Sequence, residues 1–474
     1  MEIVAFLFKL YLTYYFISNY GIIFGCVIFY LSMVLYRIAM KKIFNLEKVN
    51  NLDLYFIGGN NREKFNLIGV FFFDDLDIEK MKKIIIERSI SKIKKFRMRL
   101  VRKFAGYYWK EVPLQDAIKT IKIIENHNFT SEGDIMNYLE GEVNNHVDIL
   151  KDMPYECQLI KFNNDSGKGV MVLKLDHTLS DGLGIISATL LLADNYSEEI
   201  FPPIMRMGVS LPWYYLILNI ITFPYYGLYV FYNTLFSHSD STPLRKSKKA
   251  CGKSNFILST TFEINSLANV KKMWKVSFND LMMCAISRAT KRFVNQDEYG
   301  GLYKNLKNIK VAIPVGRKPV PKTPEMIKLN NEINMIYFKL PLIDHLECEH
   351  KVISRETKKH LMNPLLSNAA ITMANIMGEY VPMRIIHSIT DNFMDNVDLI
   401  ISNVPGPMCP LYFAGSKLTK LIPITSNSRT RAFIPILSYD KKFNLLLTID
   451  SESGIDKKEF MTLIEEEIAA LSKI

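Results

Sequence analysis

The sequence predicts an α+β protein with two halves joined around residues 200–250. Its 474 residues exceed the usual size of one domain, and 49% hydrophobic residues provide material for a large core. Strand-like runs alternate with helical patterns up to about residue 200, and the alternation restarts near residue 254. The predicted division is a membrane anchor at 1–45, an N-terminal half at 46–200, a hydrophobic linker at 201–253 and a C-terminal half at 254–474.

In the first half, short apolar or alternating runs predict strands, and apolar residues at helical spacing predict helices. The strands are expected at 64–75, 155–162 and 170–175, and the helices at 77–89 and 185–194. The last strand runs into a tight turn that precedes the last helix. Such a strand end is a usual place for functional side chains.

The same rules predict a second set of elements after residue 253. The expected strands are 254–264, 309–314, 334–340, 397–402, 430–438 and 442–449, and the expected helices are 278–293, 343–360 and a last one from 456 onward. No repeat, heptad array or low-complexity tract interrupts this pattern. The soluble part therefore reads as two mixed halves.

An uncharged run at 10–36 is followed by Arg37, Lys41 and Lys42. It exceeds the roughly 20 apolar residues that cross a bilayer, so we expect an N-terminal transmembrane helix. The basic residues behind it favour a body on the cytoplasmic side. A buried core helix is the alternative, and a cleaved signal peptide is disfavoured by the length of the run.

A second uncharged run at 207–236 contains Pro212 and Pro224. It allows either a complete crossing or a kinked segment that dips into one leaflet. A basic cluster follows it, made of Arg245, Lys246, Lys248, Lys249 and Lys253. Such a cluster suits acidic lipid headgroups.

The formal net charge of +11 favours an anionic partner: nucleic acid, an acidic membrane surface or a phosphorylated substrate such as coenzyme A. The Lys-rich stretch 82–103 has Ile and Phe at core spacing, which favours a solvated helix face over nucleic-acid binding. Six widely spaced cysteines indicate neither a zinc site nor a disulfide framework. A reducing compartment is the natural expectation.

The sharpest chemical signal is Asp176-His177-Thr178-Leu179-Ser180-Asp181-Gly182, between a predicted strand and helix. With a usual pKa near roughly 6.5, a histidine there can act as a general base. Asp181 can fix the ring or the turn, and Gly182 allows a sharp change of direction. A purely structural histidine is the alternative. A Ser-His-Asp hydrolase is disfavoured because no Gly-x-Ser-x-Gly elbow is present.

A second signal is Ser402-Asn403-Val404-Pro405-Gly406-Pro407, where a strand ends in a polar residue beside a rigid turn. A plain β-turn would give the same pattern. His345, His350 and His360 share a charged segment, but their spacing does not place them on one helical face. A metal site is therefore not expected.

These two motifs, in this order, resemble the bifunctional wax ester synthase/diacylglycerol acyltransferase family. The resemblance covers nearly the whole soluble chain. Further segments that resemble family motifs are Leu52-Asp53-Leu54-Tyr55-Phe56, Phe96-Arg97-Met98-Arg99-Leu100, Met153-Pro154-Tyr155-Glu156, Phe278-Asn279-Asp280 and Ile313-Pro314-Val315-Gly316-Arg317.

The resemblance implies two chloramphenicol-acetyltransferase-like α/β sandwich domains with a tunnel between them. It implies that His177 deprotonates an acceptor hydroxyl as that hydroxyl attacks acyl-CoA, while Asp181 holds the loop. The remaining implied site residues are Gly182, Asn279 and Asp280 as support and Asn403, Pro405 and Gly406 as cleft lining. No metal and no resident cofactor is implied, because acyl-CoA is a co-substrate. The oxyanion donor and the oligomeric state stay open.

The implied products are wax ester, triacylglycerol or both, made from a long-chain alcohol or diacylglycerol. Another lipid alcohol, such as a sterol, is an alternative acceptor, and an inactive lipid-binding protein is an alternative of another class. The chain departs from the family at Asp176, where a second histidine is usual, and at Tyr155, where tryptophan is usual. An Asp-Phe-Gly-Trp-Gly motif, typical of plant acyltransferases with soluble acceptors, is absent.

Topology follows from the two motifs. If His177 and Asn403 share one cleft, the run at 207–236 cannot cross the membrane once, because the halves would then be separated. We therefore expect a membrane-dipping segment, and a protein bound to the endoplasmic reticulum membrane with its catalytic body facing the cytoplasm.

Overall fold

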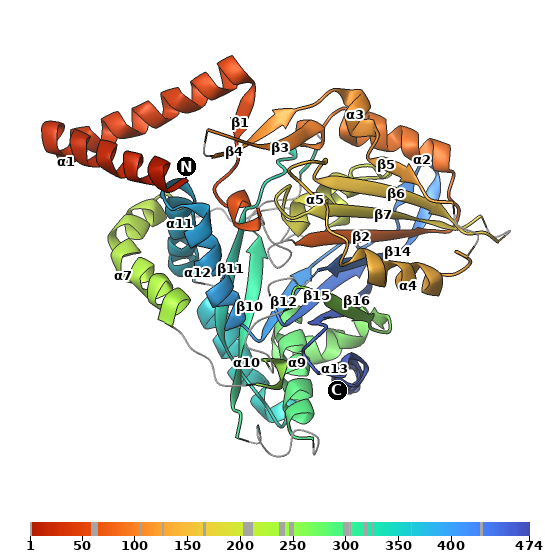
Figure 1. Ribbon diagram of the computed structural model, residues 1–474. Coiled ribbons are helices and arrows are strands. Elements are labelled where there is room, and N and C mark those ends of the chain that lie inside the picture. The colour runs from red at the N-terminus through yellow and green to blue at the C-terminus, as the bar shows by residue number, and fades with distance from the viewer. Residues whose placement is uncertain are drawn as a thin grey trace.

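The computed structural model describes residues 2–57, 65–104, 106–125, 128–164, 167–201, 212–236, 242–245, 251–296, 303, 305–316, 321–323, 326–361, 363–426 and 430–474. Within these residues, helices cover two large sheets and a small third one (Figure 1). Of the predicted motifs, Arg317, residues 207–211 and the cluster residues Lys246, Lys248 and Lys249 lie outside the described residues.

The first large sheet has the strand order β13-β14-β2-β7-β6-β5. Its strands are β2 (Asn66–Phe73), β5 (Ile121–Ile123), β6 (Tyr155–Lys161), β7 (Gly169–Asp176), β13 (Tyr412–Phe413) and β14 (Ser416–Thr425). Helices α2 (Ile78–Ile84), α3 (Leu114–Ile118), α4 (Glu132–Glu142) and α5 (Gly182–Leu190) accompany it. Every residue of β7 is buried, as expected for a central strand covered on both faces.

The alternation of side chains along β2 explains both covered faces. Phe71 and Phe73 join a core with residues of α2 and α5, whereas Ile68, Val70 and Phe72 join a second core with residues of α4. Successive side chains of a strand point to opposite faces, so an unbroken apolar run requires cover on both sides. The apolar strand predicted at 64–75 is confirmed at 66–73.

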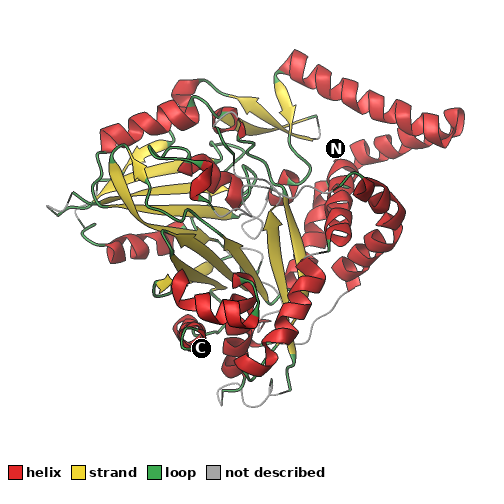
Figure 2. Cartoon of the chain, turned by 180° about the vertical axis from the view of Figure 1, so that it is seen from behind, coloured by secondary structure: helices red, strands yellow, loops and turns green. Residues whose placement is uncertain are grey.

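The second large sheet has the order β11-β10-β12-β15-β16-β8, with β9 paired to β16. Its strands are β8 (Ser254–Leu258), β9 (Phe262–Glu263), β10 (Asn308–Gly316), β11 (Ile333–Pro341), β12 (Leu399–Val404), β15 (Ala432–Tyr439) and β16 (Lys442–Asp450). One face packs on α8 (Ala268–Trp274), α9 (Phe278–Val294), α10 (Leu346–Leu361) and α13 (Lys457–Leu471), shown from behind in Figure 2.

The other face meets a layer of three helices, α7 (Tyr214–Phe236), α11 (Pro364–Tyr380) and α12 (Met383–Asp395), visible beside β10 and β11 in Figure 1. Phe393 of α12 packs with Ala312, Ile400 and Phe433 of the sheet. The sequence did not predict α11 or α12, because α11 in particular lacks a strongly polar face. This layer bears on the site, since it closes one side of a cavity.

The C-terminal half contributes one strand to the first sheet. β14 leaves the C-terminal half and pairs antiparallel with β2, from Leu418 opposite Phe73 to Thr425 opposite Leu67. The following strand, β15, returns to the second sheet next to β12. The sheets are therefore not separated at the predicted linker 201–253 but are tied together by residues 412–425.

A third sheet joins β1 (Leu46–Lys48), β4 (Gly106–Glu111) and β3 (Met98–Lys103). It follows directly on α1 (Glu2–Phe44), which differs from the single straight helix that the sequence predicts. At Gly21 the backbone has φ 77° and ψ 164°, so the helix breaks into two arms that form a V in Figure 1. A positive φ of this kind is accessible to glycine at little cost, which explains the break.

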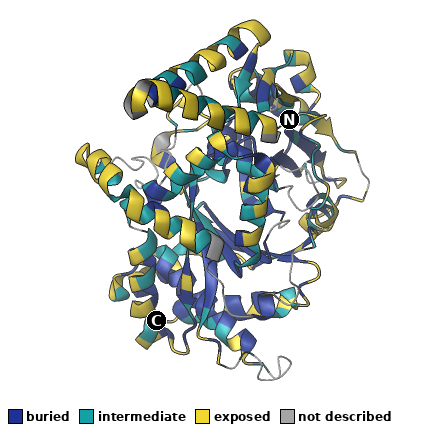
Figure 3. Cartoon of the chain, turned by 60° about the vertical axis from the view of Figure 1, so that its left-hand side comes forward, coloured by how far each residue is buried: buried dark blue, intermediate teal, exposed yellow. Residues whose placement is uncertain are grey.

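Membrane-spanning capacity is limited among the described residues. By length and composition, one helix there could cross a bilayer, at Tyr214–Thr234, and Pro224 lies within it. A core helix of a soluble protein can pass the same test, but this one is largely exposed, as Figure 3 shows along α7. The burial pattern thus favours a surface that needs a partner.

Two glycines give opposite expectations for stability. A Cβ at Gly406 would lie 2.0 Å from the carbonyl oxygen of Ser438, whereas a Cβ at Gly182 would meet nothing within 4 Å. We expect Gly406→Ala to lower the free energy of unfolding by about 1–3 kcal/mol or more, since the backbone must move. Gly182→Ala serves as the control and should leave it unchanged or raise it by about 0.4–1 kcal/mol. Thermal unfolding of both variants measures this, and equal melting temperatures would contradict it.

Candidate active site

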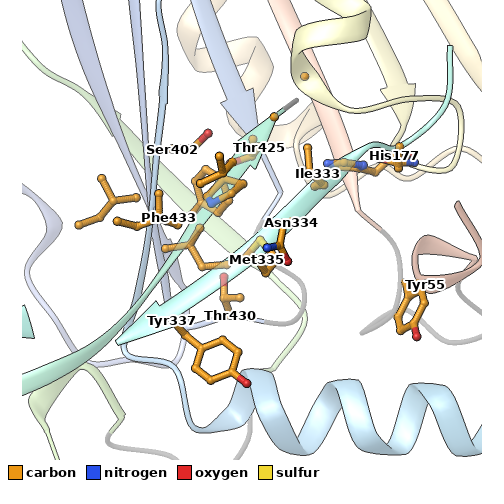
Figure 4. Close-up of a pocket in the computed structure, with 18 of the residues that line it drawn as sticks. Tyr55, His177, Ile333, Asn334, Met335, Tyr337, Ser402, Thr425, Thr430 and Phe433 are labelled. Carbon is orange, nitrogen blue, oxygen red and sulfur yellow. Dashed lines mark hydrogen bonds between the residues drawn. The ribbon is translucent and has the colours of Figure 1, made fainter. Parts of the chain in front are cut away.

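A cavity of about 680 Å³ lies between the two sheets and the α7, α11 and α12 layer. Its wall includes His177 and Gly182 from the first half and strands β10, β11, β12 and β15 from the second. In Figure 4, His177 stands at one side of the drawn residues, and Ser402, Thr430 and Phe433 lie across from it. The wall is mostly apolar, as the walls of small-molecule sites usually are.

His177 follows β7 and is buried, with 6% of its surface exposed. Its ring stacks on Phe56, with centroids 3.9 Å apart and planes at 10°, and meets the edge of Phe65 at 5.1 Å. Nδ1 is shut off from solvent and makes no geometrically normal hydrogen bond among the described residues. Nε2 is therefore the nitrogen that remains for the cavity.

Burial is the main influence on the charge of this ring. It lowers the pKa of His177 to about 4, while the residue's own backbone carbonyl, the charge of Asp181 and Asn331 act in the opposite direction. The imidazole is therefore neutral at pH 7. Asp176 is not among the groups that shift the pKa of His177. Its carboxylate accepts from the backbone N–H of Thr178 at 2.9 Å and from the Thr178 hydroxyl. Asp176, which stands where the family usually has a histidine, thus stabilises the turn that follows β7.

A buried polar chain fixes the backbone of His177. The Asn331 side chain donates from Nδ2 to the carbonyl oxygen of His177 at 2.8 Å and to Asp53 Oδ1 at 2.9 Å. Asp53, fully buried, also accepts from the backbone N–H of Asn331 at 2.7 Å and pairs with Lys95 at 3.5 Å. Burial raises the pKa of Asp53, and Lys95 partly offsets this. Lys95 also lies 3.9 Å above the ring of Trp109.

This chain gives a physical role to the Asp53 motif that the sequence analysis noted only as a resemblance. Asn331 itself was missed. It sits beside Asn330 in a short loop before β11, and nothing in the local sequence distinguishes the two. Its importance comes from a contact with residues 154 and 278 positions away.

Asp181 fixes the turn rather than the ring. Its Oδ1 accepts from the backbone N–H of Gly184 at 2.8 Å, which caps α5, and Oδ2 accepts from the backbone N–H of Glu332 at 2.9 Å. The expectation that Gly182 permits the turn is not supported, because its φ is not positive and a Cβ there would meet nothing. Gly184 is the more crowded of the two, since a Cβ there would lie 2.3 Å from Ser180 Oγ.

The second motif and the α9 start meet in the same cavity. Asn403 donates from Nδ2 to Asn279 Oδ1, and both residues line the wall together with Pro405. Asp280 lies behind it: Oδ2 accepts from Ser277 to cap α9, and Oδ1 accepts from the Thr357 hydroxyl. Gly406 is also off the wall, where its N–H donates to Ser438 Oγ at 2.9 Å.

Two wall residues that the sequence analysis missed are Thr425 and Thr430. Their side chains are 4% and 1% exposed, and neither hydroxyl has a hydrogen-bond partner among the described residues. Thr425 is the last residue of β14, and Thr430 precedes β15, which begins at Ala432 (Figure 4). Buried hydroxyls without partners in an apolar cavity are available to a polar atom of a ligand.

Two of the three histidines in the charged segment contact neighbouring side chains. His350 stacks on Trp274 with centroids 4.2 Å apart, and His360 pairs with Glu356 at 3.5 Å. Within the part of the chain that the structure describes, no group of three or more His, Cys, Asp or Glu side chains is placed to hold a metal ion.

Comparison with known proteins gives three concordant results. The model of the WS/DGAT C-terminal domain family matches residues 329–472. The wax ester synthase/diacylglycerol acyltransferase 10 of Arabidopsis thaliana is 22% identical over 451 residues, which cover 81% of this chain and 89% of that protein. The wax ester synthase/diacylglycerol acyltransferase from Marinobacter aquaeolei VT8 superposes with a TM-score of 0.57 at 15% identity, covering 90% and 100% of the two chains.

More distant structures share the architecture. The trichothecene 15-O-acetyltransferase of Fusarium sporotrichioides gives a TM-score of 0.62 at 10% identity, with 90% and 95% of the chains covered. The starter condensation domain of rhizomide synthetase gives 0.57 at 10% identity, with 86% and 89% covered. The predicted two-domain α+β fold is thereby confirmed.

The fold is that of CoA-dependent acyltransferases, and a histidine-lined cavity lies between its halves. The chain is thus similar to the wax ester synthase/diacylglycerol acyltransferase family over most of its length, which supports O-acyltransferase activity.

The polar chain behind His177 makes a stability prediction. Asn331→Ala removes two hydrogen bonds from the Asn331 side chain, one to the carbonyl oxygen of His177 and one to Asp53 Oδ1. We expect the free energy of unfolding to fall by about 1–3 kcal/mol. Asn330→Ala is the matched control, a neighbouring asparagine whose side chain donates to Glu332. Chemical denaturation compares the two, and equal losses would contradict the role of Asn331.

Proposed function

We propose that the chain transfers a fatty acyl group from acyl-CoA to the hydroxyl of a long-chain alcohol or diacylglycerol, giving wax ester, triacylglycerol or both. The observation that carries this proposal is a buried, neutral histidine with one nitrogen left for an apolar cavity of about 680 Å³. The printed names of the relatives supply the acceptor class.

His177 acts as the general base in this proposal. The acceptor hydroxyl gives its proton to Nε2 as its oxygen attacks the thioester carbonyl, which forms the new C–O bond. The tetrahedral intermediate then collapses, the C–S bond breaks, and the imidazolium returns the proton to the thiolate, so that ester and free CoA leave. A thioester is already activated, so one positioned base can suffice.

The surrounding residues support this step through position and field. Phe56 and the Asn331 bond to the His177 carbonyl hold the ring, and the negative charge of Asp181 favours the imidazolium that forms. The oxyanion needs a hydrogen-bond donor. The hydroxyls of Thr425 and Thr430, which have no partner among the residues that the structure describes, are candidates for this donor or for the bond to a second oxygen of the acceptor.

Exposed apolar surfaces near the cavity support a membrane location. α7 contributes Val230 and Thr234 to the wall, while Trp213, Leu216 and Ile220 on its outside are 78%, 68% and 68% exposed. Such apolar exposure suits a lipid surface, and lipid acceptors dissolve there. We propose binding to the cytoplasmic face of a membrane, by expectation the endoplasmic reticulum, and the net charge of +11 suits anionic partners such as acidic lipids and CoA.

The direct test is an ester-synthesis assay on membranes with labelled palmitoyl-CoA, offering a long-chain alcohol and a diacylglycerol in parallel. His177→Ala should lower the rate by about 10²–10⁴-fold, because it removes the base. The exposed His345→Ala is the matched control and should leave the rate unchanged. Ester formed equally by both variants would contradict the role of His177. No ester from either acceptor in the wild type would favour another lipid alcohol or a lipid-binding protein.

The pH dependence of kcat/KM tests the state of the base. The reaction needs neutral imidazole, and the pKa of His177 is lowered to about 4, so activity should persist below pH 6.5 and fall only as the pH approaches 4. Between these values the unfolded chain binds a proton that the folded chain does not, so stability also falls as the pH drops from 6.5 towards 4. An acid limb centred at 6.5 or above would contradict the buried neutral base.

A further inference from the structure

The two ends of the uncharged N-terminal run meet at one residue. Lys9, just before the run, donates from Nζ to the carbonyl oxygen of Glu379 at 2.7 Å. Arg37, just after the run, pairs through Nη2 with Glu379 Oε2, also at 2.7 Å. Glu379 is near the end of α11, so the run leaves the body and returns to it at the same place.

The turn between these ends is built into the chain. Gly21 takes a positive φ that other residues adopt only with strain. Near the bend the arms touch, since a Cβ at Gly25 would lie 2.7 Å from backbone atoms of Phe16 and Ile17. A glycine at such a contact lets two helices approach closely. Residues 2–44 therefore form a helical hairpin, which we call the N-terminal hairpin (Figures 1 and 3).

The length of each arm decides how far the hairpin can reach. At about 1.5 Å per residue, a straight helix over 10–36 would measure about 40 Å and cross the roughly 30 Å hydrocarbon core. Folded at Gly21, the arms 10–20 and 22–36 measure only about 16 and 22 Å. Each arm therefore exceeds the roughly 15 Å of one leaflet but cannot reach the opposite headgroups.

The surface of the hairpin matches one leaflet. Its arms carry exposed apolar and aromatic side chains, including Phe8, Leu10, Tyr11, Tyr14, Phe24, Val27, Tyr30, Leu31 and Leu35. At its base Lys41 and Lys42 are exposed. The apolar arms match the acyl chains of a leaflet, and the basic residues where the arms meet the body match its anionic headgroups.

We propose that the N-terminal hairpin dips into one leaflet of the membrane and returns, so that the N-terminus and the catalytic body lie on the same side. This replaces the single crossing that the sequence predicts for 1–45 and rests on the membrane location proposed above. α11, which binds the hairpin base through Glu379, also lines the cavity with Ala370, Met373 and Met377. The hairpin thus places the α11 wall of the cavity against the lipid that supplies acceptors.

The test uses the full chain with one epitope and a glycosylation acceptor at the N-terminus and a second epitope at the C-terminus. Sealed microsomes containing it are treated with protease, with and without detergent. We expect both epitopes to be digested without detergent, the N-terminal acceptor to stay unmodified, and the protein to resist alkaline carbonate extraction. The same acceptor behind a cleavable signal peptide is the control for glycosylation.

Two results would overturn the hairpin. A protected or glycosylated N-terminus with a digested C-terminus would show one crossing. Release of the protein by carbonate, with both epitopes digested, would show that the segment is not inserted; a second copy of the chain could then cover it, which crosslinking would detect. Ester synthesis measured on the same microsomes reports on the proposed function separately, because neither topology by itself removes His177.

Discussion

The bond from the Asn331 side chain to the carbonyl oxygen of His177 is the contact on which the site depends. It joins three segments that are far apart in sequence: the turn after β7, the loop before β11 and the Asp53 segment behind the third sheet. Each of these polar groups is buried, so a missing partner would leave a buried dipole or charge unpaired. The position of the ring is thus coupled to the docking of the two halves. The histidine is therefore placed correctly only when the interface between the halves is assembled correctly.

The same burial that fixes the ring sets its chemistry. Removal from water disfavours the imidazolium, and the opposing effects of Asp181 and Asn331 do not restore the usual pKa. A base with a low pKa is weak, but it is fully available at neutral pH and needs no ionised partner. Its weakness is tolerable because the thioester is an activated donor, and the main requirement is alignment of the hydroxyl with the carbonyl.

Periodicity in the sequence predicted elements with local causes and missed those with distant ones. The amphipathic helix at 278–293 and the strands at 430–438 and 442–449 are present as α9, β15 and β16. β14 was not recognised, because its partner β2 lies about 350 positions earlier and no local pattern records that pairing. For α1, hydropathy predicted the uncharged run but not the break at Gly21. The positive φ of that residue cannot be predicted from one glycine among apolar neighbours.

The site shows the same division. His177, Asn403 and Asn279 were found because their motifs resemble a family, and they do share a cavity. Asn331, Thr425 and Thr430 were not found, because only the folded arrangement separates them from other polar residues of loops. Gly182 was credited with a turn that does not depend on it, since the sequence shows two glycines but not that the crowded one is Gly184, beside Ser180.

The strand exchanged between the halves has a consequence for how the chain is made. As it leaves the ribosome, the first sheet has β2, β6 and β7 but lacks β14, so the edge of β2 with its run of phenylalanines stays open while some 240 further residues are synthesised. The apolar segments at 10–36 and 207–236 are by then already outside. Nascent chains of this protein therefore carry an unpaired strand edge and two apolar segments at the same time. Early capture of those segments by a membrane would keep the open edges of neighbouring chains apart until β14 arrives.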